Sequence, residues 1–248
     1  MIKIEDLHKS FNEVEVLKGV SFQVEKGEIT ALIGRSGYGK SVLLKHVAGL
    51  LKPNKGRVLI DGEEISSMTG KKLEAIRRRL GFLFQSGALF DSVTVFENVA
   101  FPLREKTKLS EEEIRKRVLG LLDQVGLIGA EDKYPAELSG GMMKRAALAR
   151  ALVINPEIML FDEPTTGLDP IIACAILNLI DSLHRRFGFT GILVTHEIPT
   201  VLMFVQRVAM LHEGKILTVE SPEQILSSRD PVVQQFVTAC ENGPIRYH

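Results

Sequence analysis

The segment Gly34-Arg35-Ser36-Gly37-Tyr38-Gly39-Lys40-Ser41 carries the strongest structural signal in this chain. It follows the run Ile29–Ile33, whose composition is typical of a strand buried on both faces of a parallel sheet. Apolar residues at helical spacing follow Lys40, so the sequence predicts a strand, a glycine-rich turn and a helix in that order. This order, together with the pattern G-x-x-x-x-G-K-[ST], is typical of a loop that cradles phosphate groups.

The chemistry of phosphate binding explains the residue types in this loop. Glycines let backbone N–H groups approach an anion without a Cβ atom in the way, and the helix directs its positive end toward the loop. We expect Lys40 to contact the β- and γ-phosphates and the Ser41 hydroxyl to bind Mg²⁺. The residues expected to bind nucleotide here are Gly34, Arg35, Ser36, Gly37, Tyr38, Gly39, Lys40, Ser41 and Val42. The alternative is a structural turn that happens to end in Lys-Ser.

A second candidate site element lies later in the chain. The apolar run Ile158–Phe161 is followed directly by Asp162 and Glu163. An open α/β sheet places its ligand site at the carboxyl ends of its strands, where these two acids are expected. Asp162 is placed to bind the Mg²⁺ shell, and Glu163 is our candidate for the base that polarises an attacking water. Alone, a strand that ends in solvated acids would be an equally good interpretation.

The order of predicted elements indicates an α/β fold. A hairpin is predicted around Asp61-Gly62, and a capping box at Ser110–Glu113 predicts the start of a helix. Parallel strands resume at 158–161 and 191–194, with a helix from about Pro170 to Phe187 between them. We therefore expect a mostly parallel sheet flanked by helices, with an N-terminal antiparallel β subdomain and an all-helical insertion.

Composition excludes several classes of protein. Lys+Arg and Asp+Glu both number 31, so the chain lacks the basic excess of a nucleic-acid binder. No apolar run approaches the roughly 20 residues of a membrane span, and the first residues already resemble a strand rather than a signal peptide. Two cysteines are too few for a disulfide framework, and Cys174 is expected to be buried in an apolar run. We expect a soluble protein that reaches any membrane through a partner.

Leu138-Ser139-Gly140-Gly141-Met142 is a second glycine-rich element that opens a helix. It resembles the signature motif of ATP-binding-cassette (ABC) nucleotide-binding domains, although Met142 stands where most members have glutamine. Together with the phosphate loop and the Asp162-Glu163 motif, it makes the chain resemble this family. The resemblance covers nearly the whole chain. It implies that Ser139, Gly140 and Gly141 contact the nucleotide bound by a second copy of the chain. An N-cap serine followed by two turn glycines is the alternative for this pentapeptide alone.

Other positions match the same family in order. Gln85 resembles the glutamine that senses Mg²⁺ and the γ-phosphate, and Asp169, in Gly167-Leu168-Asp169, resembles a loop that contacts the opposite subunit. His196 resembles the switch histidine at the γ-phosphate, and Phe11 resembles the aromatic residue that stacks on adenine. Glu197 departs from the aspartate found in many members. Without the family pattern, His196 would be taken as a surface residue and Phe11 as part of the core.

The resemblance implies a complete working unit. We expect a P-loop NTPase core, with ATP and Mg²⁺ as cofactors and Ser41, Gln85 and Asp162 around the metal. Catalysis is assigned to Glu163, His196, Lys40 and Gln85. Residues 1–248 form one nucleotide-binding domain. Its parts are a RecA-like core with the antiparallel β subdomain (1–90 and 156–220), a helical subdomain with the signature (91–155) and a helical C-terminal tail (221–248). Two copies are expected to form a homodimer that sandwiches ATP and drives integral-membrane permease subunits.

Within the family, the chain is most similar to the ATPases of bacterial Mla-type phospholipid transporters. The similarity rests on three parts of the sequence. They are residues 84–90 together with 96–105, the Met142 variant of the signature together with residues 145–150, and a C-terminal tail containing Gly243-Pro244 and Tyr247. It implies a periplasmic lipid-binding component as a further partner, no nucleic acid, and a peripheral location on the cytoplasmic face of the bacterial inner membrane. Importers of amino acids, methionine or phosphate use very similar ATPases and are the alternative.

Non-transport ABC ATPases form a second alternative. A chromosome-organising member would carry a long coiled coil between phosphate loop and signature, and a translation factor would carry two cassettes. The sequence has neither heptad runs nor a second phosphate loop. A purely structural relative should have lost Lys40, Glu163 or His196, and all three are present.

Overall fold

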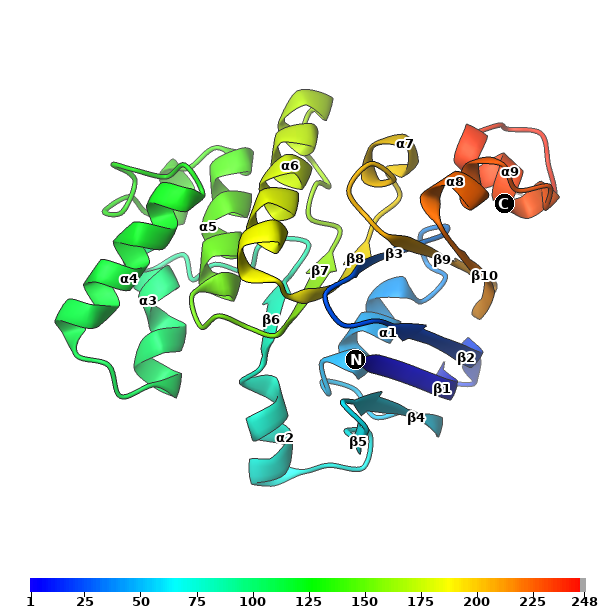
Figure 1. Cartoon of the computed structure of the whole chain (residues 1–248), viewed down its shortest axis with the longest axis horizontal. Helices are drawn as coiled ribbons and strands as arrows, with labels where there is room; N and C mark the ends of the chain where they lie inside the picture. Colours follow the sequence, from blue (N-terminus) through cyan, green and yellow to red (C-terminus); the bar gives the residue numbers. More distant parts are fainter. Residues whose placement is uncertain (246–248) are drawn as a thin grey trace. The chain divides into compact units, whose positions relative to one another are not determined.

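The computed structural model of this chain describes residues 1–245 and contains two compact units. The terminal unit joins Met1–Leu73 to Thr190–His248, of which 246–248 lie outside the described residues. The central unit is the continuous segment Glu74–Phe189. Both units contain strands and helices, coloured along the chain in Figure 1.

An antiparallel sheet forms the N-terminal part of the terminal unit, in the order β2-β1-β4-β5. Its strands are β1 (Ile2–Phe11), β2 (Val14–Val24), β4 (Lys55–Ile60) and β5 (Glu63–Glu64). Asp61 and Gly62 between β4 and β5 both have positive φ, 50° and 84°, as a tight two-residue hairpin turn requires. The predicted hairpin and the predicted antiparallel subdomain are therefore present.

The rest of the terminal unit is built on β3, which lies between two parallel neighbours. The strands are β3 (Ile29–Ile33), β8 (Thr190–Val194), β9 (Arg207–His212) and β10 (Lys215–Glu220). All five residues of β3 and of β8 are buried, which explains why these strands lack polar alternation. The helices are α1 (Lys40–Val47), α7 (Ile198–Val201), α8 (Pro222–Leu226) and α9 (Pro231–Thr238).

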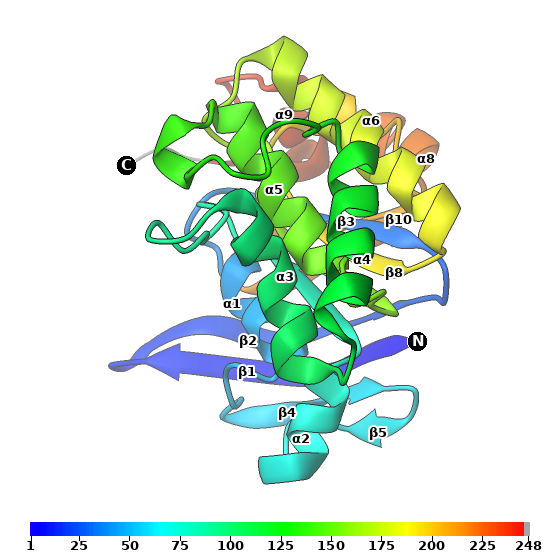
Figure 2. The same cartoon turned by 90° about the vertical axis from the view of Figure 1, so that its left-hand side faces the viewer.

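The central unit combines two parallel strands with long helices. Its strands are β6 (Leu80–Leu83) and β7 (Ile158–Asp162). Its helices are α3 (Val95–Lys106), α4 (Glu111–Gln124), the 3-10 turn η1 (Pro135–Glu137), α5 (Gly140–Leu152) and α6 (Pro170–Phe187). α2 (Gly70–Arg77) spans the boundary between the units. α3 packs on α4 and α5, as Figure 2 shows, and α5 also packs on β6 and α6.

Several predicted elements have the expected boundaries. α6 runs from Pro170 to Phe187 as predicted, and the Ser110–Glu113 capping box has both of its hydrogen bonds. α8 and α9 lie within the predicted tail, whereas Tyr247 lies outside the described residues. The helical insertion at 91–155 stays a prediction, because the compact central unit also includes β6, β7 and α6.

One prediction about the core was wrong. Cys174 is half-buried rather than buried, because α6 turns Ala173, Ile176 and Leu177 inward and leaves Ile171 80% exposed. Within residues 1–245, no helix combines the length and apolar character that crossing a bilayer requires.

Candidate nucleotide-binding and hydrolysis site

The predicted phosphate loop directly follows β3 and leads into α1. Gly34, Gly37 and Gly39 have φ values of 142°, 84° and 98°, a conformation that residues with a Cβ rarely adopt. Gly39 is the N-cap of α1, so no side chain caps the first turn of this helix. The loop thus joins three permissive glycines to an uncapped helix N-terminus, an arrangement suited to an anion with several oxygens.

Lys40 lies inside this loop. Its side chain is only 5% exposed, and its Nζ donates hydrogen bonds to Gly34 O at 2.7 Å and Arg35 O at 3.0 Å. A buried ammonium needs close oxygen partners, and phosphate oxygens can supply them as well as carbonyls do. Ser41 and Val42 are half-buried in the first turn of α1, next to Lys40. These residues therefore fit a polyphosphate.

Aromatic and basic side chains within the phosphate loop contact one another and the His212 ring beside the loop. The Tyr38 ring meets the His212 ring edge-on, with centroids 5.4 Å apart, and the Arg35 guanidinium lies 5.9 Å from the Tyr38 centroid. These contacts hold the exposed half of the loop, which contains Ser36, against the end of β9. Two predicted loop residues therefore also stabilise the loop itself.

Phe11 is the last residue of β1 and is 42% exposed, so the alternative of a plain core residue is wrong. The following turn is formed by Asn12 and Glu13, which have positive φ values of 43° and 69°. The Lys9 ammonium lies 5.1 Å from the centre of the Phe11 ring, and the exposed part of the ring can still contact a planar partner.

His196 is exposed and follows β8, two residues after its end. Because β3 and β8 are parallel neighbours with Leu32 opposite Val194, His196 lies on the same edge of the sheet as the phosphate loop. The Thr195 backbone N–H donates to Leu32 O at 3.4 Å, and the Thr195 hydroxyl accepts from Glu197 N at 3.1 Å. Adjacent strand ends thus bring together two predicted parts of the site.

The central unit brings Glu163 and Gln85 together. β6 and β7 are parallel with Leu83 opposite Phe161, so both residues lie just beyond neighbouring strand ends. The Glu163 carboxylate accepts hydrogen bonds from Gln85 Nε2 at 3.1 Å and from the Thr166 hydroxyl at 2.8 Å. Glu163 has a φ of 48°, a strained conformation for glutamate, and such strain is concentrated at functional positions. Asp162 precedes it at the end of β7 and is 6% exposed.

The predicted signature opens α5. The Ser139 hydroxyl caps the helix by accepting from Met142 N at 3.3 Å, as the N-cap alternative requires. Gly140 and Gly141 do not form a loop turn before the helix, because they are the first two residues of α5. A Cβ atom added to Gly141 would lie 2.8 Å from Ile172 Cγ2, so this glycine permits close packing of α5 against α6.

Asp169, in the predicted subunit-contact loop, caps α6. Its carboxylate accepts from the backbone N–H groups of Ile171 and Ile172, both at 3.1 Å. The exposed Asp169 side chain is therefore fixed at the start of α6 beside the exposed Ile171. Within the described part of the chain, no three His, Cys, Asp or Glu residues form a metal-binding group.

The sequence did not predict two residues that contact the site. The Thr166 hydroxyl bonds to Glu163, and the Lys144 ammonium donates to the backbone carbonyl of Gln85. Lys144 is 7% exposed in a helix whose other buried residues are apolar, a contrast that only the folded structure reveals.

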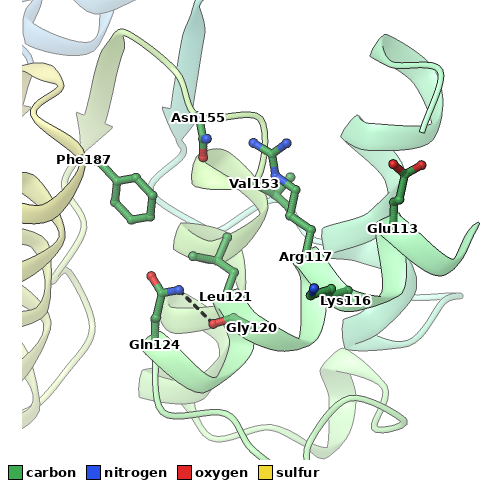
Figure 3. A pocket seen from close by; sticks show the side chains of 9 residues that line it. All are labelled: Glu113, Lys116, Arg117, Gly120, Leu121, Gln124, Val153, Asn155 and Phe187. Atoms are coloured by element: carbon green, nitrogen blue, oxygen red, sulfur yellow. Dashed lines mark hydrogen bonds between the residues drawn. The ribbon is translucent and has the colours of Figure 1, made fainter. Parts of the chain in front are cut away.

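A pocket of about 430 Å³ also lies in the central unit (Figure 3). α4 supplies most of its lining, including Lys116 and Arg117, and Phe187 at the end of α6 contributes an apolar wall. None of the predicted site residues lines it.

Substitution of Gly34 should test how closely the loop is packed. A Cβ atom at Gly34 would lie 2.1 Å from Leu211 O, whereas one at Gly37 meets nothing within 4 Å. Gly37→Ala should lower the free energy of unfolding by about 1–2 kcal/mol through its positive φ alone. Gly34→Ala adds a collision with backbone, so we expect a loss of roughly 2–5 kcal/mol. Urea unfolding without nucleotide measures both, and equal losses would contradict this account.

Together, the parallel strands, the glycine-rich loop after β3 and the two acids at and directly after the end of β7 define a P-loop NTPase. The chain belongs to the ABC transporter family, because the model of this family matches residues 17–166. Family membership makes it a transport ATPase that binds and hydrolyses ATP.

Two known proteins are similar in sequence to this chain along its whole length. It is 42% identical over 247 residues to the intermembrane phospholipid transport system ATP-binding protein MlaF of Haemophilus influenzae, covering 100% of this chain and 94% of that protein. It is 45% identical over 263 residues to the chloroplastic protein TRIGALACTOSYLDIACYLGLYCEROL 3 of Arabidopsis thaliana, covering 100% of this chain and 76% of that protein.

A solved ABC cassette has the same fold. The dimeric, post-hydrolysis structure of the cassette MJ0796, bound to ADP and Pi, matches with a TM-score of 0.82 and 36% identity. The match covers 90% of this chain and 99% of that one. The predicted P-loop NTPase fold is therefore confirmed.

Proposed function

We propose that this chain is the ATP-hydrolysing subunit of an ABC transporter that moves phospholipid between bacterial membranes. The observation that carries the cargo assignment is the identity of 42% to an intermembrane phospholipid transport ATPase along essentially the entire chain. The paired Glu163 and Gln85 support the catalytic part of the proposal, because a binding-only relative has no need of an oriented carboxylate.

ATP binding is assigned to the phosphate loop. Lys40 exchanges its two loop carbonyls for β- and γ-phosphate oxygens, and the N–H groups at the start of α1 face the same oxygens. Phe11 offers its exposed ring to adenine. We assign the Ser41 hydroxyl, the Gln85 amide and the Asp162 carboxylate to Mg²⁺, because they are hard oxygen donors of the kind that this ion prefers; when bound, it would supply positive charge against the phosphates.

Hydrolysis is assigned to Glu163. Its carboxylate takes up a proton of the attacking water as the water oxygen bonds to the γ-phosphorus, while the bond from the γ-phosphorus to the β–γ bridging oxygen breaks and ADP leaves with that oxygen. Gln85 and Thr166 donate to this carboxylate and so fix its direction before the reaction. His196 is assigned a contact with the γ-phosphate from the sheet edge that carries the phosphate loop.

The active form is a homodimer with ATP between the two copies. In this form, Ser139, Gly140 and Gly141 at the N-terminus of α5 face the nucleotide of the partner copy. Ile171 is 80% exposed directly after the Asp169 loop, and an apolar side chain at that place suits an interface. The similar cassette MJ0796 was solved as a dimer.

The remaining partners follow from the proposed transport role. The dimer works with integral-membrane permease subunits and a periplasmic lipid-binding component, on the cytoplasmic face of the bacterial inner membrane. The absence of a basic excess agrees with a protein that binds no nucleic acid.

Purification of the complex from native membranes tests the cargo. We expect the tagged chain to co-purify with an integral-membrane protein, and mass spectrometry to find phospholipid well above the level in a mock purification. Reconstituted complexes should transfer fluorescent phospholipid only when ATP is hydrolysed. Bound amino acid, methionine or phosphate, with no phospholipid, would refute the cargo and leave the ATPase assignment standing.

A further inference from the structure

Lys144 is a buried cation that the proposed reaction does not use. It lies in α5 after the signature glycines and is only 7% exposed. Its Nζ donates to the backbone carbonyl of Gln85, whose side chain in turn donates to Glu163. Burial lowers the pKa of Lys144, and the negative charge of Glu163 acts in the opposite direction. The Lys144 ammonium is thus linked to the carboxylate assigned as the base through Gln85.

α5 contacts the same segment at a second place. Arg150 donates from Nη1 to Ala88 O and from Nη2 to Gly87 O, both at 2.8 Å. Its guanidinium also lies 5.7 Å from the centre of the Phe90 ring. Two cationic side chains of one helix therefore hold three of the four backbone carbonyls between Gln85 and Ala88, those of Gln85, Gly87 and Ala88.

The segment needs such support from outside. Gly87 and Ala88 both have positive φ, 77° and 47°, and a chain in this conformation does not hold itself in place through regular secondary structure. The Gly87 N–H donates to Phe84 O at 2.8 Å and so closes a turn around the exposed Gln85, and the bond from Lys144 holds the Gln85 carbonyl of that turn from outside. The direction of the Gln85 amide toward Glu163 consequently depends on α5.

We propose that Lys144 is a positioning residue for ATP hydrolysis, which holds the Gln85 main chain so that the Gln85 amide orients Glu163. This inference rests on the proposed function, since it takes Glu163 as the base. Because α5 begins at the signature, Lys144 ties the position of Ser139–Gly141 to the direction of the catalytic carboxylate. Lys144 does not belong to the phosphate loop, so ATP binding does not depend on it.

Three substitutions separate this role from simple packing. Lys144→Met retains the length of the side chain and removes the donor, so we expect kcat to fall about 10-fold, the effect of roughly 1.4 kcal/mol, with KM nearly unchanged. Lys144→Arg retains a cationic donor and should recover a large part of kcat. Lys116→Met removes an exposed lysine of α4 in the same unit and is the matched control.

Hydrogen exchange and ATPase assays of the purified chain provide the test. In Lys144→Met, amides 86–90 should exchange faster than in the wild type, and Lys144→Arg should restore their protection, with ATP affinity unchanged in both. Wild-type kcat in Lys144→Met, or equal loss of ATP affinity and kcat, would overturn the inference. If Lys144→Met does not fold, failure of Lys144→Arg to retain both kcat and protection overturns it. Normal hydrolysis by Glu163→Gln would instead overturn the proposed function.

Discussion

Glu163→Gln should lower kcat for ATP hydrolysis by about 100- to 10,000-fold, the contribution of a positioned general base. Glutamine has the shape of glutamate, and its carbonyl oxygen can still accept the hydrogen bonds from Gln85 and Thr166. The fold and the affinity for ATP should therefore be unchanged. Because the nucleotide binds but is not consumed, the variant should accumulate as a stable ATP-loaded dimer.

Glu157→Gln is the matched control for this experiment. Glu157 immediately precedes β7, Glu163 immediately follows it, and Glu157 pairs with Arg79 outside the site. Single-turnover hydrolysis and size-exclusion chromatography with and without Mg-ATP measure the two effects. We expect Glu157→Gln to hydrolyse at the wild-type rate. Hydrolysis at that rate by Glu163→Gln would exclude Glu163 as the base.

Lys40→Ala should strongly weaken ATP binding. The ammonium is buried in the loop and already donates two hydrogen bonds to oxygen atoms. Hydrogen bonds to charged groups contribute about 1.5–3 kcal/mol each. Loss of two such contacts to phosphate should weaken binding about 100-fold or more. Isothermal titration with a non-hydrolysable ATP analogue measures the affinity directly.

Lys45→Ala serves as the control. Lys45 lies in the last turn of the same helix α1, and its substitution removes an equal charge. Its affinity for the analogue should remain within about twofold of the wild type. Lys40→Arg adds a useful comparison, since a planar guanidinium does not fit a site shaped for a compact ammonium. Tight binding by Lys40→Ala would mean that the loop does not hold the phosphates.

The sequence predicted local structure correctly where a short motif determines the backbone conformation. Asp61-Gly62 forms the predicted hairpin, and Ser110 with Glu113 forms the predicted capping box. The hairpin at Asn12-Glu13 was not predicted, because its two positive-φ residues are not glycines and the adjacent strands contain irregular registers. Phe11 at that hairpin was consequently open to interpretation as core.

Contacts between distant segments explain what the sequence could not predict. Gly140 and Gly141 resemble turn residues, yet they lie in a helix, and Gly141 allows Ile172 to approach from α6. Lys144 contacts the Gln85 carbonyl across 59 positions of the chain, and no local pattern records such a pairing. The roles of the site residues remain predictions that the substitutions above test.

The order in which the strands are made has a consequence for biosynthesis. β3 leaves the ribosome early, but its two neighbours β8 and β9 follow only after the whole segment Glu74–Phe189. That segment is continuous and is translated as one piece, and its own parallel pair of strands, β6 and β7, is complete once it has been made. The nascent chain therefore lacks a sheet beneath its phosphate loop for most of translation, and nucleotide affinity is among the last properties it acquires.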